Sequence, residues 1–275
     1  MTYSFDAAIA LQVDPTVEGI YSGHTHLAWT NMVGPFGGIT AAALLNAVML
    51  HPKRLGEPIA LTVNFCAAIS DGPYHIQAIA ARTNRSTQHW TMTLQQSGET
   101  VITVTAITAL RRQTWGVNDC SMPVVNPPET YALAGSPLPW TTRYQMRPLV
   151  GALPAVWDDA KSSSLTHLWV RDAEQRALDM VALAALCDVF FPRIYLRRAK
   201  LVPIGTVSLT TYFHCDAGQL AELQGMDEHA DSRGYVLGQA QGLCFRNGFF
   251  DQTASVWSSN GTLLTNTHQT VYYKE

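Results

Sequence analysis

One stretch, Leu178 to Pro192 (LDMVALAALCDVFFP), constrains the fold of this chain more than any other. Its central residues, Val181 to Cys187, are good helix formers and are apolar on every side. A helix that is hydrophobic all round needs cover on every side, so this one is predicted to lie inside a sheet rather than on a surface. Pro192 disfavours helical backbone at Phe191, so the helix is expected to end close to Asp188.

Asp188 is a carboxylate deep inside this apolar segment. The dipole at the end of a helix opposes a negative charge there, and a buried carboxylate is costly unless it is hydrogen-bonded or paired. Two interpretations therefore stand. Asp188 is either a structural residue bonded to backbone or Ser/Thr groups, which is the more common case for such a residue alone, or a functional one.

Composition excludes several classes of partner. The chain has 275 residues, 47% of them hydrophobic and 14% charged, with a net charge of −3, which argues against a nucleic-acid partner. No run approaches membrane-spanning length and the first ten residues do not resemble a signal peptide, so we expect a cytoplasmic protein with no membrane partner. The five cysteines are scattered without a CxxC pair, which predicts neither a disulfide framework nor a zinc site.

The chain repeats one unit of strand, buried helix and antiparallel strands. In the first half the patterns predict a helix over Ile39–Leu50 and strands over Ser22–Thr30, Ile59–Ala68, Tyr74–Arg82, Thr87–Gln96 and Thr100–Arg111. In the second half a helix lies within Asp172–Phe191, and strands are expected over Ser164–Arg171, Val202–His214, Tyr235–Phe245, Phe250–Ser259 and Thr262–Tyr273. Tight hairpins at Ser97-Gly98 and Asn260-Gly261 close the two halves.

A stretch rich in Pro, Asn, Gly and Ser separates the two halves. Such composition predicts a connector, here over residues 113–140. The sequence therefore predicts an N-terminal domain over residues 1–112 and a C-terminal domain over residues 141–275.

Several segments carry a resemblance to a known family. They are GPFGGITAAALL and ALTVNF in the first half, and LCDVFFP, IGTVSLTTYFH and NGTLLTNTHQ in the second. In order and spacing they resemble the double-hotdog acyl-CoA thioesterases, the bacterial thioesterase II family and its thioesterase-like relatives. The resemblance implies an α+β fold of two tandem hotdog units, each a central helix wrapped by a curved antiparallel sheet.

The resemblance also implies a catalytic trio. Matching the family's motifs places its Asp, Thr and Gln at Asp188, Thr206 and Gln269. Ser208 and Thr210 are expected on the same face of the strand as Thr206 and are rivals for its role. Thioester hydrolysis needs a positioned water, a base and donors for the developing charge, so Asp188 is expected to act as base or to orient the water that the other two hold. No Ser-His, Cys-His or GxSxG arrangement suggests a covalent intermediate.

Four further residues are candidates for binding substrate. Gly37 and Gly38 precede a helix, where free N–H groups could face a thioester oxygen, although they belong to the half without the trio. His24 could line the acyl channel, and Arg193 begins a basic cluster that could meet the phosphates of coenzyme A. The first-half helix carries no acid, so one active site per chain is expected.

The leading hypothesis is an acyl-CoA thioesterase of fatty acid metabolism that uses water and needs no cofactor or metal. A hotdog enoyl-thioester hydratase or dehydratase is the alternative enzyme, although it generally uses an Asp-His pair that is not evident. A non-catalytic acyl-thioester or lipid-binding protein is the alternative outside enzymes. Exposed sheet edges and hydrophobic helices suggest a homodimer or a higher homo-oligomer.

Overall fold

The computed structural model describes residues 2–160, 163–225 and 233–275. The first half of the chain forms a helix wrapped by strands. Its elements are α1 (Ser4–Ala8), β1 (Gln12–Val13), β2 (Ile20–His24), the 3-10 helix η1 (Leu27–Trp29), α2 (Gly37–Met49), β3 (Glu57–Phe65), β4 (Pro73–Thr83), β5 (Thr87–Gln96) and β6 (Glu99–Ala109).

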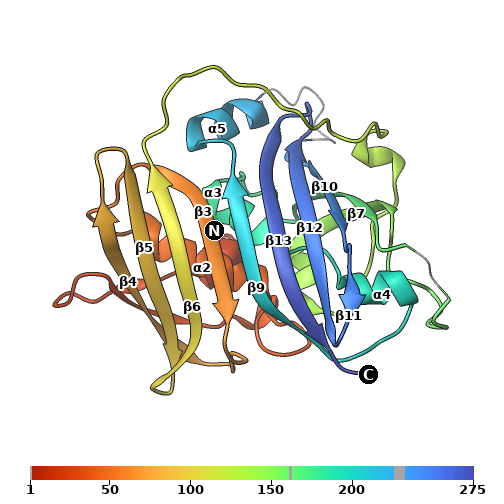
Figure 1. Cartoon of the computed structure of the whole chain (residues 1–275), viewed down its shortest axis with the longest axis horizontal. Helices are drawn as coiled ribbons and strands as arrows, with labels where there is room; N and C mark the ends of the chain where they lie inside the picture. Colours follow the sequence, from red (N-terminus) through yellow and green to blue (C-terminus); the bar gives the residue numbers. More distant parts are fainter. Residues whose placement is uncertain (1, 161–162, 226–232) are drawn as a thin grey trace.

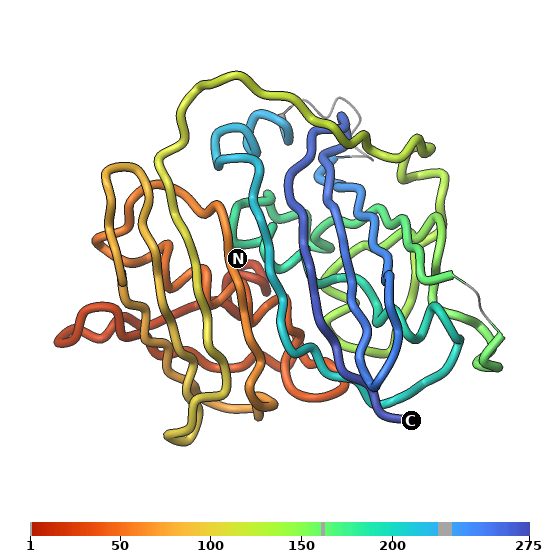
Figure 2. Tube along the Cα trace, in the orientation of Figure 1, coloured from red at the N-terminus to blue at the C-terminus, as the bar shows by residue number. Residues whose placement is uncertain are grey.

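The second half repeats this plan with two more short helices. Its elements are β7 (Tyr144–Val150), β8 (Thr166–Asp172), α3 (Met180–Leu186), α4 (Arg193–Arg198), β9 (Ile204–Phe213), α5 (Ala217–Gly225), β10 (Val236–Gln241), β11 (Phe245–Arg246), β12 (Phe249–Ser258) and β13 (Leu263–Tyr273). Between the halves the connector holds two 3-10 helices, η2 (Pro128–Thr130) and η3 (Pro139–Arg143), and passes over one end of the sheet (Figure 2).

The strands of both halves form one antiparallel sheet (Figure 1). Its order is β1-β2-β4-β5-β6-β3-β9-β13-β12-β10-β8-β7, and β11 pairs with β12 beside this path. The two halves meet where β3 pairs with β9, in a register that sets Ala60 opposite Tyr212 and Asn64 opposite Ser208. The sheet therefore continues from one half into the other without an interruption.

The helices α2 and α3 lie together behind this sheet (Figure 1). Both consist almost entirely of buried residues, as expected for helices that are apolar on every side. The helix α3 begins at the side chain of Asp179, which accepts a hydrogen bond from the Ala182 N–H at 2.8 Å. The two helices approach closely, because a Cβ atom on Gly38 would lie only 2.4 Å from the Ala185 carbonyl oxygen.

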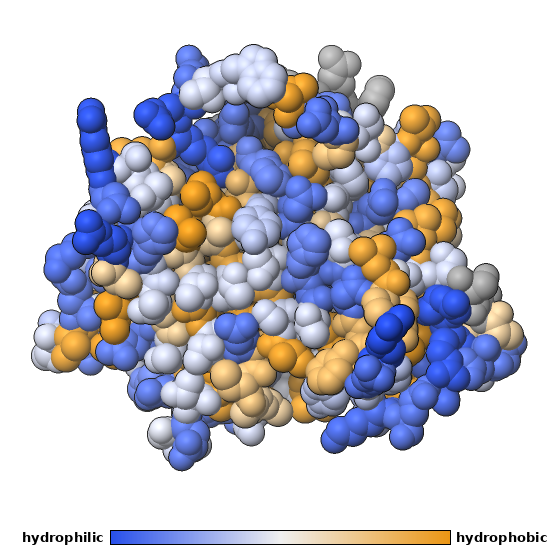
Figure 3. All heavy atoms as spheres, viewed as in Figure 1, coloured by the Kyte–Doolittle hydropathy of each residue, from blue (hydrophilic) through white to orange (hydrophobic). Residues whose placement is uncertain are grey.

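Alternation along the strands separates the core from the solvent. On β5, Trp90, Met92 and Leu94 face the helices, while His89 and Thr91 face outward. The outer face of the sheet shows mostly polar residues and residues of intermediate hydropathy, with hydrophobic side chains scattered among them (Figure 3). The apolar core is accordingly held between the sheet and its two central helices.

The predicted α+β double hotdog is confirmed, whereas several local predictions need correction. The strand expected over Ser22–Thr30 ends at His24, because the His26 ring accepts the Ala28 N–H and begins a 3-10 turn. The strand β7 and the helices α4 and α5 were not predicted. The predicted domain boundaries at residues 112 and 140 stay predictions. Within the described part of the chain, no helix is long and apolar enough to cross a membrane.

Candidate active site

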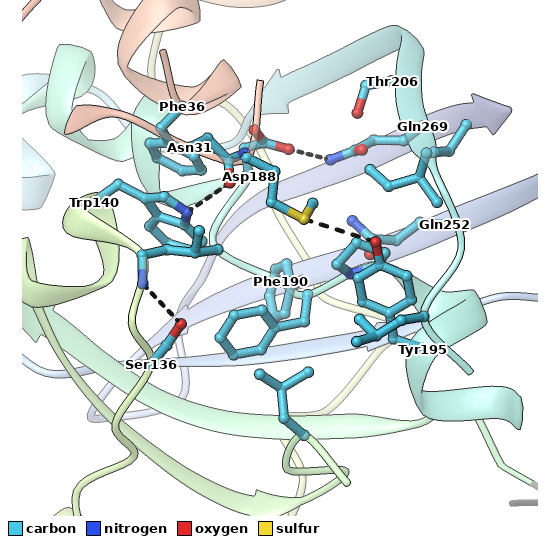
Figure 4. Close-up of a pocket in the computed structure, with 18 of the residues that line it drawn as sticks. Asn31, Phe36, Ser136, Trp140, Asp188, Phe190, Tyr195, Thr206, Gln252 and Gln269 are labelled. Carbon is cyan, nitrogen blue, oxygen red and sulfur yellow. Dashed lines mark hydrogen bonds between the residues drawn. The ribbon is translucent and has the colours of Figure 1, made fainter. Parts of the chain in front are cut away.

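Asp188 lies just beyond the end of α3, within the interior of the molecule. Its backbone N–H still bonds to the Ala185 carbonyl at 3.2 Å, which carries the helical turn past Leu186. Its Oδ1 accepts a hydrogen bond at 2.7 Å from Nε2 of Gln269 (Figure 4). The backbone N–H of Gly38 donates a second hydrogen bond to its carboxylate. The sequence predicted a buried carboxylate here, and these are the partners that its burial requires.

The N-terminus of α2 approaches this carboxylate from the other half of the chain. A Cβ atom on Gly37 would lie only 2.7 Å from Oδ2 of Asp188, so glycine permits the close approach. The first turn of a helix has free N–H groups and a positive dipole end, both of which stabilise an anion. The Asp188 carboxylate therefore lies at the positive end of the α2 dipole, although in the chain it follows the negative end of its own helix, α3.

The pKa of Asp188 is shifted toward neutral pH. The pKa of its carboxyl group is raised to about 7, because burial raises it by more than the hydrogen bonds from Gln269 and the Gly38 backbone lower it. The carboxyl group is surrounded by protein, and its partly accessible atoms face two cavities. A carboxyl group with a pKa near 7 can both take up and release a proton at physiological pH.

Thr206 faces the same site because β9 carries a bulge. Thr270 pairs with Ser208, but the next residue, Val271, pairs with Thr206, so Val207 is an extra residue on β9. The bulge reverses the alternation, which turns Thr206 toward the cavity that Asp188 lines. The expectation that Ser208 and Thr210 share the face of Thr206 is therefore wrong.

The two rival residues point to the outer face of the sheet and bond across the junction of the halves. Ser208 Oγ donates to Oδ1 of Asn64 at 2.9 Å, and the hydroxyls of Thr210 and Thr62 lie 3.0 Å apart. Both side chains hold β9 to β3. They are consequently separated from Asp188 by the sheet itself.

Gln269 lies on the inner face of β13, and its side chain is buried. It stands opposite Leu209 on one neighbouring strand and opposite Gln252 on the other. Because its Nε2 donates a hydrogen bond to Asp188, the Gln269 amide holds the carboxylate next to the inner face of the sheet. The structure thus brings Asp188, Thr206 and Gln269 to one wall (Figure 4).

The first cavity at this wall has a volume of about 410 Å³ and a largely apolar lining. Phe190 and Phe191, which directly follow the acid, contribute to it, as do Tyr195 and Val271. The end of the connector forms the opposite side, where Trp140 stacks on Phe36 with ring centroids 4.3 Å apart (Figure 4). The cavity is of the size that binds small molecules in proteins.

A second cavity of about 310 Å³ meets the first at the acid. It lies between segments of both halves, with Gly37, Phe65 and Tyr272 in its wall, and it opens at exposed residues such as Val33 and Cys66. Asp188 and Thr206 line both cavities. A molecule bound across the two would therefore pass directly beside these side chains.

Two predicted binding residues lie elsewhere. Arg193 is fully buried, and its guanidinium donates to the carbonyls of Ser164 and Phe191 and to the Thr166 hydroxyl, so it is not open to phosphate groups. His24 is exposed and borders a separate pocket of only about 20 Å³. Neither residue lines either cavity at Asp188.

Sequence reasoning missed several polar and aromatic residues of the wall. Gln252 alternates with the buried Phe250 and Ala254 on β12, a signal that could have placed it on the inner face. Asn31 accepts a hydrogen bond from the Trp140 indole at 3.1 Å, across a separation that no local pattern reveals. In the part of the chain that the structure describes, no group of three His, Cys, Asp or Glu could hold a metal ion.

Comparisons with known proteins agree with this architecture. Residues 25–109 match a family model described as the acyl-CoA thioesterase N-terminal domain, and residues 121–273 match the model of the C-terminal domain. No match was found among the curated proteins.

Solved structures are similar over nearly the whole chain. A protein of unknown function with a hot dog fold from Alicyclobacillus acidocaldarius is 43% identical, over 100% of this chain and 99% of its own, with a TM-score of 0.90. A putative thioesterase II from Thermobifida fusca is 18% identical, over 100% and 98%, with a TM-score of 0.82. An acyl-CoA thioesterase II from Mycobacterium marinum is 15% identical, over 98% of each chain, with a TM-score of 0.76. The Thermobifida fusca and Mycobacterium marinum structures have the same fold as this chain.

Proposed function

The chain belongs to the acyl-CoA thioesterase family, and we propose that it hydrolyses acyl-CoA to a free carboxylic acid and coenzyme A. The observation that carries the proposal is the position of Asp188. A carboxyl group with a raised pKa stands between Gln269 and the N-terminus of α2, where an apolar cavity meets a second cavity that opens at the surface. A thioester with an apolar acyl group and a polar coenzyme A arm matches that arrangement.

In the proposed mechanism, Asp188 activates a water molecule that Thr206 and Gln269 help to position. The water oxygen attacks the thioester carbonyl carbon while its proton passes to the Asp188 carboxylate. Free N–H groups in the first turn of α2 stabilise the charge that develops on the carbonyl oxygen. The intermediate then collapses, the carbon–sulfur bond breaks, and the leaving thiolate of coenzyme A takes the proton back from Asp188.

The acyl group is assigned to the cavity of about 410 Å³, because aromatic and aliphatic side chains dominate its wall. The arm of coenzyme A is assigned to the second cavity, which borders exposed residues of both halves. A role in fatty acid metabolism, a cytoplasmic location and a homodimer or higher homo-oligomer stay predictions.

The direct test is release of free coenzyme A from a panel of acyl-CoA chain lengths. Turnover of at least one straight-chain acyl-CoA supports the proposal. Hydration of crotonyl-CoA without hydrolysis would favour the hydratase instead, although the side chain that bonds Asp188 in the described residues is Gln269 and not a His. Tight binding without either reaction would favour a binding protein.

The pH dependence of the rate follows from the state of Asp188. Because the carboxylate form is the base, kcat/KM is expected to rise with pH and to level off above about 7. The Gln269 hydrogen bond lowers this pKa, so Gln269→Leu should move the rising limb to higher pH in addition to slowing the reaction. A pH–rate profile of both proteins checks this. A limb near pH 4 in the wild type would contradict it.

Chain-length preference is expected to depend on Leu153. A further cavity of about 340 Å³ lies next to the acyl cavity, and Leu153, Phe190 and Phe191 line both. Leu153→Ala should join the two spaces and admit a longer chain. Two further buried methylenes, at about 0.8 kcal/mol each, correspond to roughly a tenfold gain in kcat/KM for longer acyl-CoAs.

Leu201 provides the matched control for this change. It lines the acyl cavity but not its neighbour, and it is 61% exposed. Leu201→Ala should therefore leave the preferred chain length where it was. An equal shift in both variants would show that the second space is not reached through Leu153.

A further inference from the structure

Gln252 is a polar side chain in the wall of the cavity assigned to the acyl group. It lies in the middle of β12, faces inward, and is only 3% exposed. Apart from Gln269 on the neighbouring strand, its neighbours on this face of the sheet include the apolar Phe250 and Val271. A purely hydrocarbon chain would offer its amide nothing to bond.

Several other polar side chains of this wall have hydrogen-bond partners within the protein, whereas Gln252 has none among the described residues. The Tyr195 hydroxyl donates to the Val202 carbonyl at 2.9 Å, the Gln269 amide donates to Asp188, and Asn31 accepts from an indole. Among the residues that the structure describes, none makes a hydrogen bond to the Gln252 side chain. The Gln252 amide is not among the fully enclosed polar groups that lack a partner, so it is open to the cavity, where a hydrogen-bonding group on the occupant can pair with it.

The register of the sheet locates Gln252 relative to the reacting group. Gln252 stands directly opposite Gln269, and Gln269 bonds Asp188. Neighbouring strands lie about 4.8 Å apart, which places the Gln252 amide one strand further into the acyl cavity than the water site. An acyl-CoA whose thioester stood beside Asp188 would therefore bring its first acyl carbons, at about position 3 of the chain, within reach of the Gln252 amide.

We propose that the cavity takes acyl groups with a hydrogen-bonding oxygen near position 3, and that Gln252 recognises that oxygen. The inference rests on the proposed thioesterase function. A glutamine amide has two N–H donors and one carbonyl acceptor. Its N–H groups can donate to the oxygen of a 3-oxo or a 3-hydroxy group, and its carbonyl oxygen can accept from a 3-hydroxy group. Sites that bond a substrate oxygen discriminate strongly against the analogue that lacks it, because the protein group is then left unpaired.

The test compares a 3-hydroxyacyl-CoA with the unsubstituted acyl-CoA of the same length. For the wild type we expect kcat/KM to be at least about tenfold higher on the hydroxylated substrate. Gln252→Leu, which replaces the amide by an apolar side chain of similar size, should lower that ratio by about tenfold or more. Thr253→Val, on the outward side of the same strand, should leave the ratio and both rates unchanged.

Three outcomes would overturn the inference. An equal loss on both substrates would assign Gln252 to the thioester group, and an unchanged ratio would show that it does not contact the acyl chain. A wild type that prefers the unsubstituted substrate would also reject it.

Binding separates this inference from the proposed function. Calorimetric titration of the Asp188→Asn protein with the two acyl-CoAs measures the preference without turnover. If the wild type hydrolyses neither thioester but the titration still favours the hydroxylated ligand, then the proposed function fails while the recognition by Gln252 stands. No preference in the titration rejects the inference whether or not hydrolysis occurs.

Discussion

Asp188→Asn is expected to lower kcat for acyl-CoA hydrolysis by at least about 100-fold, as is typical when an acid–base group is removed. The change is nearly isosteric. The carbonyl oxygen of the introduced amide can still accept the hydrogen bond that now comes from Gln269, so the cavity should keep its shape. What is lost is the charge that takes the proton from water. Release of coenzyme A under saturating substrate measures the effect.

The same substitution is expected to make the protein more stable at pH 8. The pKa of Asp188 is about 7 in the folded protein and close to 3.9 in an unfolded chain, so the folded state binds more protons between these values. Stability is then lost as pH rises from about 4 to 7, by at most about 4 kcal/mol. Asn carries no charge and avoids this loss. A higher Tm at pH 8 together with lost activity would exclude unfolding as the cause, whereas equal rates would remove Asp188 from the mechanism.

Gly38→Ala is expected to cause the largest loss of stability. The added Cβ would lie 2.4 Å from the Ala185 carbonyl oxygen and 2.5 Å from the Phe36 ring. The carbonyl belongs to the backbone of α3, so α2 and α3 must move apart. Overpacking of this kind costs about 1–3 kcal/mol or more, and it also pulls the Gly38 N–H away from Asp188. Thermal denaturation should show a Tm lower by several degrees, and hydrolysis should fall with it.

Gly218 offers a control for the substitution itself. It is exposed at the start of α5, and a Cβ there would meet nothing nearer than 3.4 Å. Gly218→Ala should leave the Tm unchanged or raise it slightly, because alanine favours helix. If Gly38→Ala were equally harmless, the close contact between the two central helices would not be important for stability.

The sequence allowed the large elements to be predicted because each has a strong local pattern. Residues 181–187 are apolar on every side, so burial of α3 followed directly, and the anomaly of Asp188 followed from that burial. Alternation placed most of the long strands to within a few residues, although β7 was missed and the strand expected over Ser22–Thr30 ends at His24. Thr206 and Gln269 depended on a family resemblance, because as single residues they are ordinary strand residues.

The remaining parts of the site depend on geometry that no local pattern encodes. One extra residue at Val207 decides which hydroxyls of β9 face the cavity, and strict alternation gave the wrong answer for Ser208 and Thr210. Arg193 belongs to a run of basic residues, yet its side chain turns inward to backbone carbonyls. The pairing of Gly38 with Asp188 joins residues that are far apart in the chain, so only the assembled sheet brings them together.

The way the sheet ends limits how copies of this chain can associate. The two halves of the sheet are joined by the pairing of β3 with β9, so β1 and β7 are its outermost strands. The first has only two residues, and the second contains Pro148 and an irregular register beside it. Short strands and proline are devices that stop one sheet from adding to another. Any assembly of this protein should therefore be built face to face rather than as a ribbon that grows from strand to strand.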